Sequence, residues 1–347
     1  MNERKIISTT RVIGVGLVVL GHSLTEAVKA NNLTLDILSD FIYSFHMFLF
    51  FFLAGLLFEK GLNKYLNNRK EFLMNKTKLL LYPYVFLSVF GYSLGFIAQR
   101  LGVNLLSATE LEPVNIIKAF LLNINHFDTH IWYIYFLFVI FAVNIFFPKI
   151  LMKCSVMILL VVSGAFYGVL SLTGVRINTF LYYLIPFLMG RHAFKRDGIK
   201  KISAMNPWKI SWIGIAFILT NCLIIYVDSL RGIASPVIGQ LKIGVYYELK
   251  IVAGILGTVG MIYLSSRISK MTKGTIVSVI DDYSYAIYLL HQPYLTTACM
   301  AIFGRIIGLN IVSVMMTFFV SIVVSITVTK FIIRKVKILH LLVIGNR

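Results

Sequence analysis

An arginine and a histidine stand eleven residues apart in an apolar segment near the amino terminus, at Arg11 and His22. Eleven residues make about three turns of an α-helix, so both side chains lie on one face, roughly 16 Å apart along the axis. Ionisable groups are expensive in a bilayer and are rarely placed there without a partner, a cavity or a task. Histidine is also the side chain best suited to accept a proton near neutral pH. This pair is therefore the first candidate for a functional site.

The composition predicts the elements that carry this pair. Of the 347 residues, 58% are hydrophobic and 14% are charged, and the mean hydropathy is +0.84. A soluble domain could not bury so much apolar surface, so the chain is predicted to be an all-α polytopic membrane protein. Counting apolar stretches of about 20 residues gives about ten spans. They are 6–26, 41–58, 79–98, 131–151, 154–172, 177–190, 210–228, 245–264, 276–300 and 308–333.

The basic residues predict the orientation of these spans. If the amino terminus is cytoplasmic, most of the 33 lysines and arginines fall on the cytoplasmic side, and nearly all of the net charge of +19 falls there too. Both termini are then cytoplasmic. No loop is long enough to fold alone, so residues 1–347 are predicted to form a single transmembrane domain without an appended soluble domain. Topology and contact with membrane lipid account for the basic loops, and we expect no nucleic acid partner.

Five of the seven histidines fall toward the outer side of the membrane on this topology. They come from four parts of the chain and are His22, His46, His126, His130 and His291. Each one taken alone fits an interfacial residue satisfied by hydrogen bonds. Together with aromatic neighbours such as Trp132 and Tyr285, they indicate the wall of a polar, aromatic-lined cavity.

The residues around these histidines narrow the chemistry. The sequence has no His-Glu-x-x-His segment and no GxxxxGK loop, so we expect neither a metal site nor the use of ATP. The three cysteines lie in apolar runs without paired spacing, at Cys154, Cys222 and Cys299. Glu26 is predicted one helical turn outward from His22, where it would orient the imidazole and raise its basicity. A carboxylate at the membrane surface is the alternative interpretation of Glu26.

Five short motifs occur in one order along the first nine predicted spans. They are Arg11-x10-His22 with its Leu-Gly-His-Ser ending, Ser44-Phe-His46 with the aromatic run to Gly55, Tyr82-Pro83-Tyr84, His130-Ile-Trp132-Tyr, and the segment from Tyr283 to His291-Gln-Pro. In this order they resemble acyltransferase family 3, a family of bacterial integral membrane proteins. No single motif is decisive, but five in sequence are highly specific.

The resemblance implies an enzyme of the bacterial cytoplasmic membrane. Such an enzyme takes an acyl group, usually acetyl, from cytoplasmic acyl-CoA and delivers it to a hydroxyl of an extracytoplasmic glycan or glycolipid. The resemblance also implies that Arg11 and His22 are essential. Acyl-CoA carries several negative phosphate charges, so Arg11, Lys76 and Lys78 are expected to bind this co-substrate, with His22 as the general base.

The remaining candidate residues face the acceptor or the reacting carbonyl. The thioester carbonyl becomes an oxyanion in the transition state, and His291 or a tyrosine would donate a hydrogen bond to it. The acceptor sugar is expected to contact His46, His130, Trp132 and Tyr285. A transporter that exports a polysaccharide or a lipid-linked sugar, with histidines relaying protons, is the alternative function. The absence of an inverted repeat disfavours it.

Overall fold

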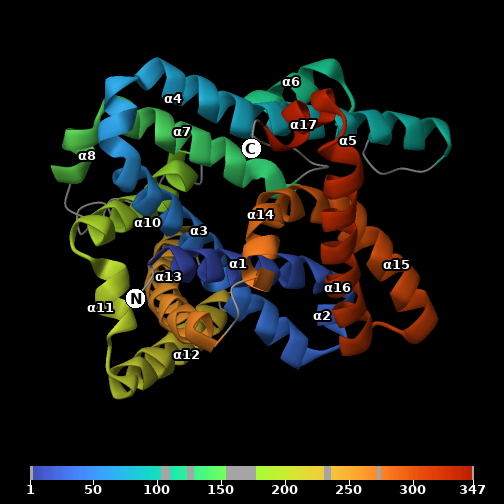
Figure 1. Ribbon diagram of the computed structural model, residues 1–347. Helices are drawn as coiled ribbons and strands as arrows, with labels where there is room; N and C mark the ends of the chain where they lie inside the picture. The colour runs from blue at the N-terminus through green and yellow to red at the C-terminus, as the bar shows by residue number, and fades with distance from the viewer. Residues whose placement is uncertain are drawn as a thin grey trace. The chain divides into compact units, whose positions relative to one another are not determined.

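The computed structural model describes residues 3–102, 110–122, 129–153, 177–229, 236–271 and 275–345 (Figure 1). Within these ranges the chain forms α-helices, short π- and 3-10-helical turns and connecting loops, and it forms no strand there. The predicted all-α class is therefore confirmed. The predicted fifth span, 154–172, lies outside the described residues.

Six of the described helical segments are long and apolar enough to cross a membrane. They are Glu3–Ser23, Leu33–Asn67, Arg69–Arg100, Pro207–Ser229, Lys242–Met271 and Ile311–Ile333. A seventh apolar helix, Trp132–Phe146, is shorter. The chain is thus a multi-pass membrane protein by length and composition of its helices. The count of ten spans and the cytoplasmic position of the termini stay predictions.

The chain divides into two compact units. One comprises residues 1–62 and 147–284, and the other comprises 63–146 and 285–347. Helices α3 (Leu33–Asn67) and α14 (Thr275–Leu290) each begin in the first unit and end in the second. The single-domain organisation expected from the sequence stays a prediction.

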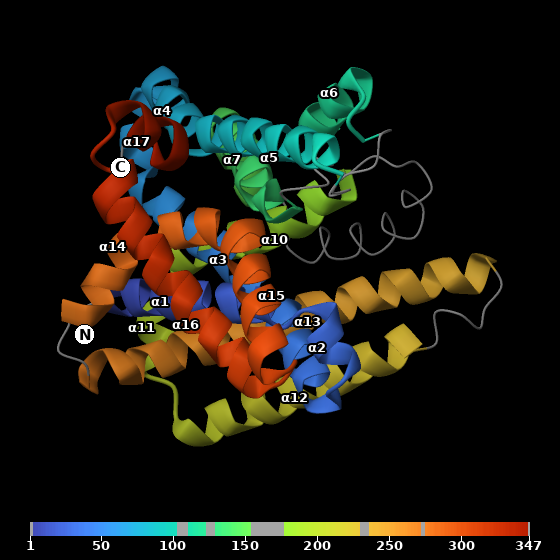
Figure 2. The same ribbon diagram turned by 90° about the vertical axis from the view of Figure 1, so that its right-hand side faces the viewer.

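The first unit holds both residues of the arginine–histidine pair. Besides parts of α3 and α14 it contains α1 (Glu3–Ser23), α2 (Glu26–Ala30), α8 (Pro148–Lys153), α10 (Ile177–Lys195), α11 (Gly198–Ser203), α12 (Pro207–Ser229) and α13 (Pro236–Met271). Helix α13 packs on α1, α11 and α12, and it lies beside α12 in both views (Figures 1 and 2). Helix α12 exposes large apolar side chains such as Leu219 and Leu223, as expected of a helix that faces lipid.

The second unit carries most of the aromatic candidates. Besides parts of α3 and α14 it contains α4 (Arg69–Lys76), η1 (Thr77–Leu81), α5 (Tyr82–Arg100), α6 (Pro113–Leu122), η2 (Thr129–Ile131), α7 (Trp132–Phe146), η4 (His291–Leu295), α15 (Thr296–Ile307), α16 (Ile311–Val328), η5 (Thr329–Ile333) and α17 (Lys337–Ile344). Helix α15 packs beside α16, and α17 packs on α5. A capping box between Asn310 and Ser313 fixes the start of α16.

The predicted ninth span, 276–300, is not one continuous helix. Helix α14 ends at Leu290, and the following turn contains Gln292 with the extended dihedrals φ −120° and ψ 144°. Pro293 favours the break, because a proline ring disfavours the helical conformation in the residue before it and removes a backbone N–H. The chain resumes as α15 at Thr296. His291 therefore lies at a kink inside the predicted ninth span.

Two glycines let α3 and α10 cross at backbone contact. A Cβ on Gly190 would lie 1.9 Å from the carbonyl oxygen of Phe52, and a Cβ on Gly55 would lie 1.9 Å from that of Phe187. At this crossing the buried guanidinium of Arg191 donates to Glu59, with Nε 2.7 Å from Oε2. Small residues allow two helices in a membrane to pack closely. Here the close packing also buries the ion pair between Arg191 and Glu59 away from water.

Gly190→Ala is expected to destabilise the protein by about 3 kcal/mol, because backbone atoms of α3 would have to move to admit the methyl group. Gly260→Ala on α13 is the matched control, since a Cβ there meets nothing within 4 Å. Alanine at that position should be neutral or mildly stabilising. Thermal unfolding of both variants in one detergent measures the difference. Equal melting temperatures would contradict the tight crossing.

Candidate functional site

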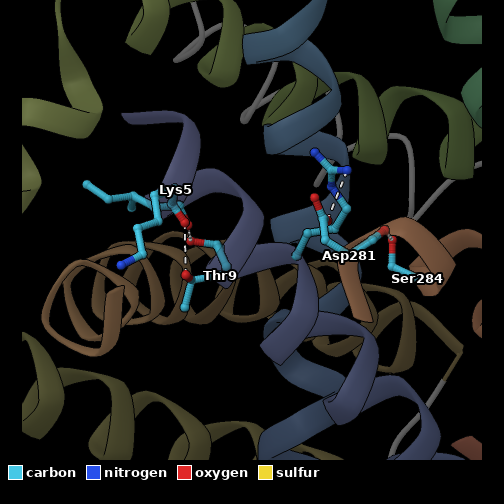
Figure 3. Close-up of polar contacts among 7 residues, drawn as sticks. Lys5, Thr9, Asp281 and Ser284 are labelled. Carbon is cyan, nitrogen blue, oxygen red and sulfur yellow. Dashed lines mark hydrogen bonds and ion pairs between the residues drawn. The ribbon is translucent and has the colours of Figure 1, made fainter. Parts of the chain in front are cut away.

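Arg11 is held by an acidic residue from a distant part of the chain. Its Nη1 lies 3.1 Å from Oδ1 of Asp281 on α14, and both side chains are partly exposed, at 25% and 18%. Figure 3 shows Asp281 with the dashed line of this ion pair and Ser284 one turn further along α14. The carboxylate fixes the direction of the guanidinium while leaving part of it accessible. Such an arrangement suits a cation that must be oriented toward an anionic ligand.

Helix α1 runs without a break from Glu3 to Ser23 and so carries both members of the pair. The side chain of Thr9 donates to the carbonyl of Lys5 (Figure 3). Ser23 likewise donates to the carbonyl of Val19, so these hydroxyls are satisfied within the helix. The predicted helix between Arg11 and His22 is confirmed. Their separation along the axis is therefore roughly 16 Å, from the helical rise.

His22 contacts a tyrosine that links it to a second histidine. The hydroxyl of Tyr43 lies 3.4 Å from Nδ1 of His22, and the two rings meet edge to face. The same tyrosine ring lies 5.1 Å from that of His46. His46 is buried, and its Nδ1 lies 2.7 Å from the carbonyl of Ile42. The first unit thus contains a row of two imidazoles joined by a phenol.

Glu26 does not continue the helix of His22, so the predicted position one turn further along it is wrong. Helix α1 ends at Ser23, and Thr25 is extended before α2 begins at Glu26. Glu26 forms an ion pair with Lys29 at 2.6 Å, and its side chain is 92% exposed. This geometry matches the alternative interpretation of Glu26 as a surface carboxylate.

A second pair of histidines lies in the second unit. The rings of His130 and His291 are 5.3 Å apart, and both residues are buried. Nδ1 of His291 lies 3.1 Å from the carbonyl of Ile287, and the hydroxyl of Tyr288 donates to the carbonyl of His130. A carbonyl only accepts, so Nδ1 of His291 carries the proton in the neutral ring, and Nε2 is an acceptor.

Two prolines release backbone carbonyls that site residues then use. Pro83 cannot donate to the carbonyl of Leu79 four residues before it, and the hydroxyl of Tyr285 donates to that carbonyl instead. In the same way Pro293 leaves the carbonyl of Leu289 to Nε2 of His130, at 3.3 Å. The proline motifs therefore help to fix the positions of Tyr285 and His130. Tyr285 was expected to contact the acceptor, but its hydroxyl proton is donated to the carbonyl of Leu79.

The predicted donor lysines lie at the junction of α4 and η1. The ammonium of Lys76 stands 4.4 Å from the ring centre of Phe141 and 5.5 Å from that of Phe72, which are cation–π contacts. Lys78 lies in the π-helical turn and is half-buried. Trp132 begins α7 and packs against Tyr133 and Phe136. The structure thus divides the candidates between the units.

Each unit holds its own share of the predicted residues. The first holds Arg11, His22, Glu26 and His46, and the second holds Lys76, Lys78, His130, Trp132, Tyr285 and His291. Sequence reasoning missed Asp281 and Tyr43. Asp281 could have been noticed because it is an acidic residue inside a predicted apolar span, and a charge in such a segment is usually paired with an opposite charge. Tyr43 offered no comparable signal.

Within the described ranges no group of three His, Cys, Asp or Glu side chains is arranged to hold a metal ion. Comparison with known families gives a more specific result. A family model described as an acyltransferase domain matches residues 5–330, nearly the whole chain. No curated protein and no solved structure matches.

Proposed function

The chain belongs to acyltransferase family 3, and from this membership we propose that it moves an acyl group from cytoplasmic acyl-CoA to a hydroxyl of an extracytoplasmic glycan or glycolipid. Acetyl is the acyl group we expect, and the bacterial cytoplasmic membrane is the expected location. The observation that carries the proposal is the match over residues 5–330 together with Arg11 and His22 on one unbroken helix.

Arg11 is the proposed ligand for the phosphates of the donor. The ion pair with Asp281 pre-orients its guanidinium, and a fork of N–H donors suits phosphate oxygens. The pantetheine arm of CoA is long and slim, comparable in reach to the separation of Arg11 and His22 along α1. A donor held at Arg11 would therefore present its thioester near His22. Lys76 and Lys78 are further proposed contacts for the phosphates.

His22 is the proposed general base. When Nδ1–H of His22 donates to the oxygen of Tyr43, the other ring nitrogen, Nε2, carries a lone pair that accepts the proton of the sugar hydroxyl. The hydroxyl oxygen then forms a bond to the thioester carbonyl, and the C–S bond breaks. The CoA thiolate leaves and takes the proton from the imidazolium.

The buried histidines suit a sugar better than an oxyanion. His46 and His291 each use Nδ1–H on a carbonyl, so both rings offer Nε2 as an acceptor for hydroxyl groups. An oxyanion needs donors, so this tautomer of His291 favours a place in acceptor binding over its predicted role at the carbonyl. Trp132 adds an aromatic surface of the kind that apolar sugar faces contact.

Purified protein in lipid nanodiscs, supplied with radiolabelled acetyl-CoA, tests the proposed activity. Label that passes to an added glycan or glycolipid, or is released as acetate, supports the enzyme. Accumulation of glycan in sealed vesicles without acyl transfer would instead favour the transporter. Mass spectrometry of surface glycans from cells with and without the gene then identifies the natural acceptor.

The proposed direction of transfer requires a defined topology, which we expect thiol labelling to reveal. With the three native cysteines changed to serine, cysteines at Lys200 and Lys270 should be shielded from an impermeant maleimide in intact cells, because these positions lie in the basic loops that we predict to be cytoplasmic. A cysteine at Asn32, which is exposed between α2 and α3, should be labelled. Labelling at position 200 from outside would contradict this orientation.

A further inference from the structure

An open-sided cavity of about 660 Å³ lies in the first unit, apart from the arginine–histidine pair. Five helices contribute to its lining: α3, α8, α10, α11 and α13. None of the residues proposed above to bind the donor or the acceptor lines this cavity. It is large enough to enclose a phosphate group together with part of a hydrocarbon chain.

Three of the residues that line the cavity carry a positive charge. Lys153 ends α8, Arg196 connects α10 to α11, and Lys201 lies on α11, and the side chains of all three are exposed. Among the described residues that line the cavity, none is acidic. Three cations with no carboxylate among the described lining residues create a positive potential, which favours an anion.

The nearby acidic groups are already engaged elsewhere. Glu59 pairs with Arg191 and with Lys195, at 2.7 Å and 3.1 Å. Asp197 pairs with Lys200 at 2.8 Å, and this hydrogen bond lowers the pKa of the Asp197 carboxyl. Lys200 does not line the cavity, although it is the immediate neighbour of Lys201. The three basic residues that line the cavity take no part in these ion pairs.

Other residues that line the cavity are apolar. They include Phe52 of α3, Met189 of α10 and Ile202 of α11, which belong to one hydrophobic cluster or pack against it. An inorganic anion would gain nothing from contact with these side chains. A ligand with a phosphate head and a hydrocarbon tail would use both the basic and the apolar lining residues.

On the predicted topology, in which residues 177–190 form a span, the cations of this region fall at the level of lipid headgroups. The apolar segment of α10 ends at Gly190 and is followed directly by Arg191, His192 and Lys195. Basic residues that directly follow an apolar membrane segment lie where anionic phospholipid headgroups are found. A membrane protein meets such lipids at its own surface, so this ligand needs no separate supply.

We propose that this cavity binds an anionic phospholipid, with its phosphate among Lys153, Arg196 and Lys201 and an acyl chain along Phe52, Met189 and Ile202. The lipid would connect α8, α10, α11 and α13. Because α13 packs on α1, the bound lipid supports the helix that carries Arg11 and His22. This inference does not depend on acyl transfer.

Binding of phosphatidylglycerol to protein in phosphatidylcholine nanodiscs tests the proposal, with native mass spectrometry as the readout. We expect wild type to retain phosphatidylglycerol and the double variant Arg196→Gln/Lys201→Gln to bind it at least about tenfold more weakly, since two hydrogen-bonding charges are lost. Lys209→Gln/Lys270→Gln is the matched control, because it removes the same charge from exposed positions outside the cavity. It should bind as wild type does.

Melting temperatures in phosphatidylcholine alone show whether each variant is folded. Added phosphatidylglycerol should raise the melting temperature of wild type and of the control pair but not that of the double variant. Equal binding by the double variant and wild type would overturn the proposal. Displacement of the lipid by inorganic phosphate or by micromolar CoA would also overturn it, by assigning the cavity to a soluble anion.

Discussion

His22→Ala is expected to lower the rate of acyl transfer by at least about a hundredfold while the protein stays folded in the membrane. General base catalysis contributes about 10²- to 10⁴-fold, and a sugar hydroxyl is a poor nucleophile until its proton is accepted. Transfer from acetyl-CoA to the acceptor, measured with purified variant and wild type in the same nanodiscs, gives the ratio. His340→Ala on α17 is the control, because that histidine is not among the proposed site residues.

Tyr43→Phe tests the role of Tyr43 in orienting His22 separately from the role of His22 as the base. Losing the hydroxyl 3.4 Å from Nδ1 should reduce the maximal rate by about tenfold and shift the pH profile, because the preferred ring tautomer changes. A purely structural role for Tyr43 would lower stability without moving the pH profile. Retention of a tenth of wild-type activity in His22→Ala would remove His22 from the role of base, whatever Tyr43→Phe shows.

The arginine–histidine geometry could be predicted because helical periodicity is local. Apolar residues around Arg11 and His22 favour one helix, and the helical repeat alone then puts both on one face. The end of that helix was less predictable. The helix ends at Ser23, and Glu26 begins another helix after the extended Thr25. The predicted role of Glu26 in orienting His22 assumed one continuous helix, so it has lost its geometric basis.

The partners of the site residues could not be read from local pattern. Asp281 lies far along the chain from Arg11, and only the tertiary packing within the first unit brings their charges to 3.1 Å. The carbonyl bonds of Tyr285 and His130 depend on the same kind of long-range pairing. The sequence nonetheless indicated that two carbonyls would need such partners. Pro83 and Pro293 each lack a backbone N–H, so each leaves a carbonyl of the preceding turn without its helical donor.

Hydropathy located the apolar stretches better than the lengths of the helices. The predicted fourth span, 131–151, corresponds to the shorter helix Trp132–Phe146, followed by Pro148 at the start of α8. The predicted sixth span, 177–190, lies within α10, which contains Pro186 and ends in basic residues. A count of apolar residues does not show where a proline or a charge ends a helix. Such a count therefore does not fix the length of a helix that is only just long enough to span the membrane.

Arg11→Ala is expected to weaken binding of CoA by about ten- to a hundredfold, since a charge-assisted contact to phosphate is lost. Affinity for the acceptor should change little. Arg11→Lys should restore binding only in part, because a point charge replaces a fork of donors. Isothermal calorimetry with CoA, together with separate KM values for acetyl-CoA and the acceptor, measures both effects.

Exchanging the two charges tests whether Arg11 does more than hold α1 to α14. The double variant Arg11→Asp/Asp281→Arg can re-form an ion pair with the opposite polarity, so its melting temperature should return toward that of wild type. CoA affinity should not return, because the guanidinium now projects from α14 and a carboxylate stands at position 11. Unchanged CoA affinity in Arg11→Ala, or full activity in the exchanged pair, would show that Arg11 serves the fold alone. Donor binding would then have to be sought at Lys76 and Lys78, where the ammonium of Lys76 already faces aromatic rings.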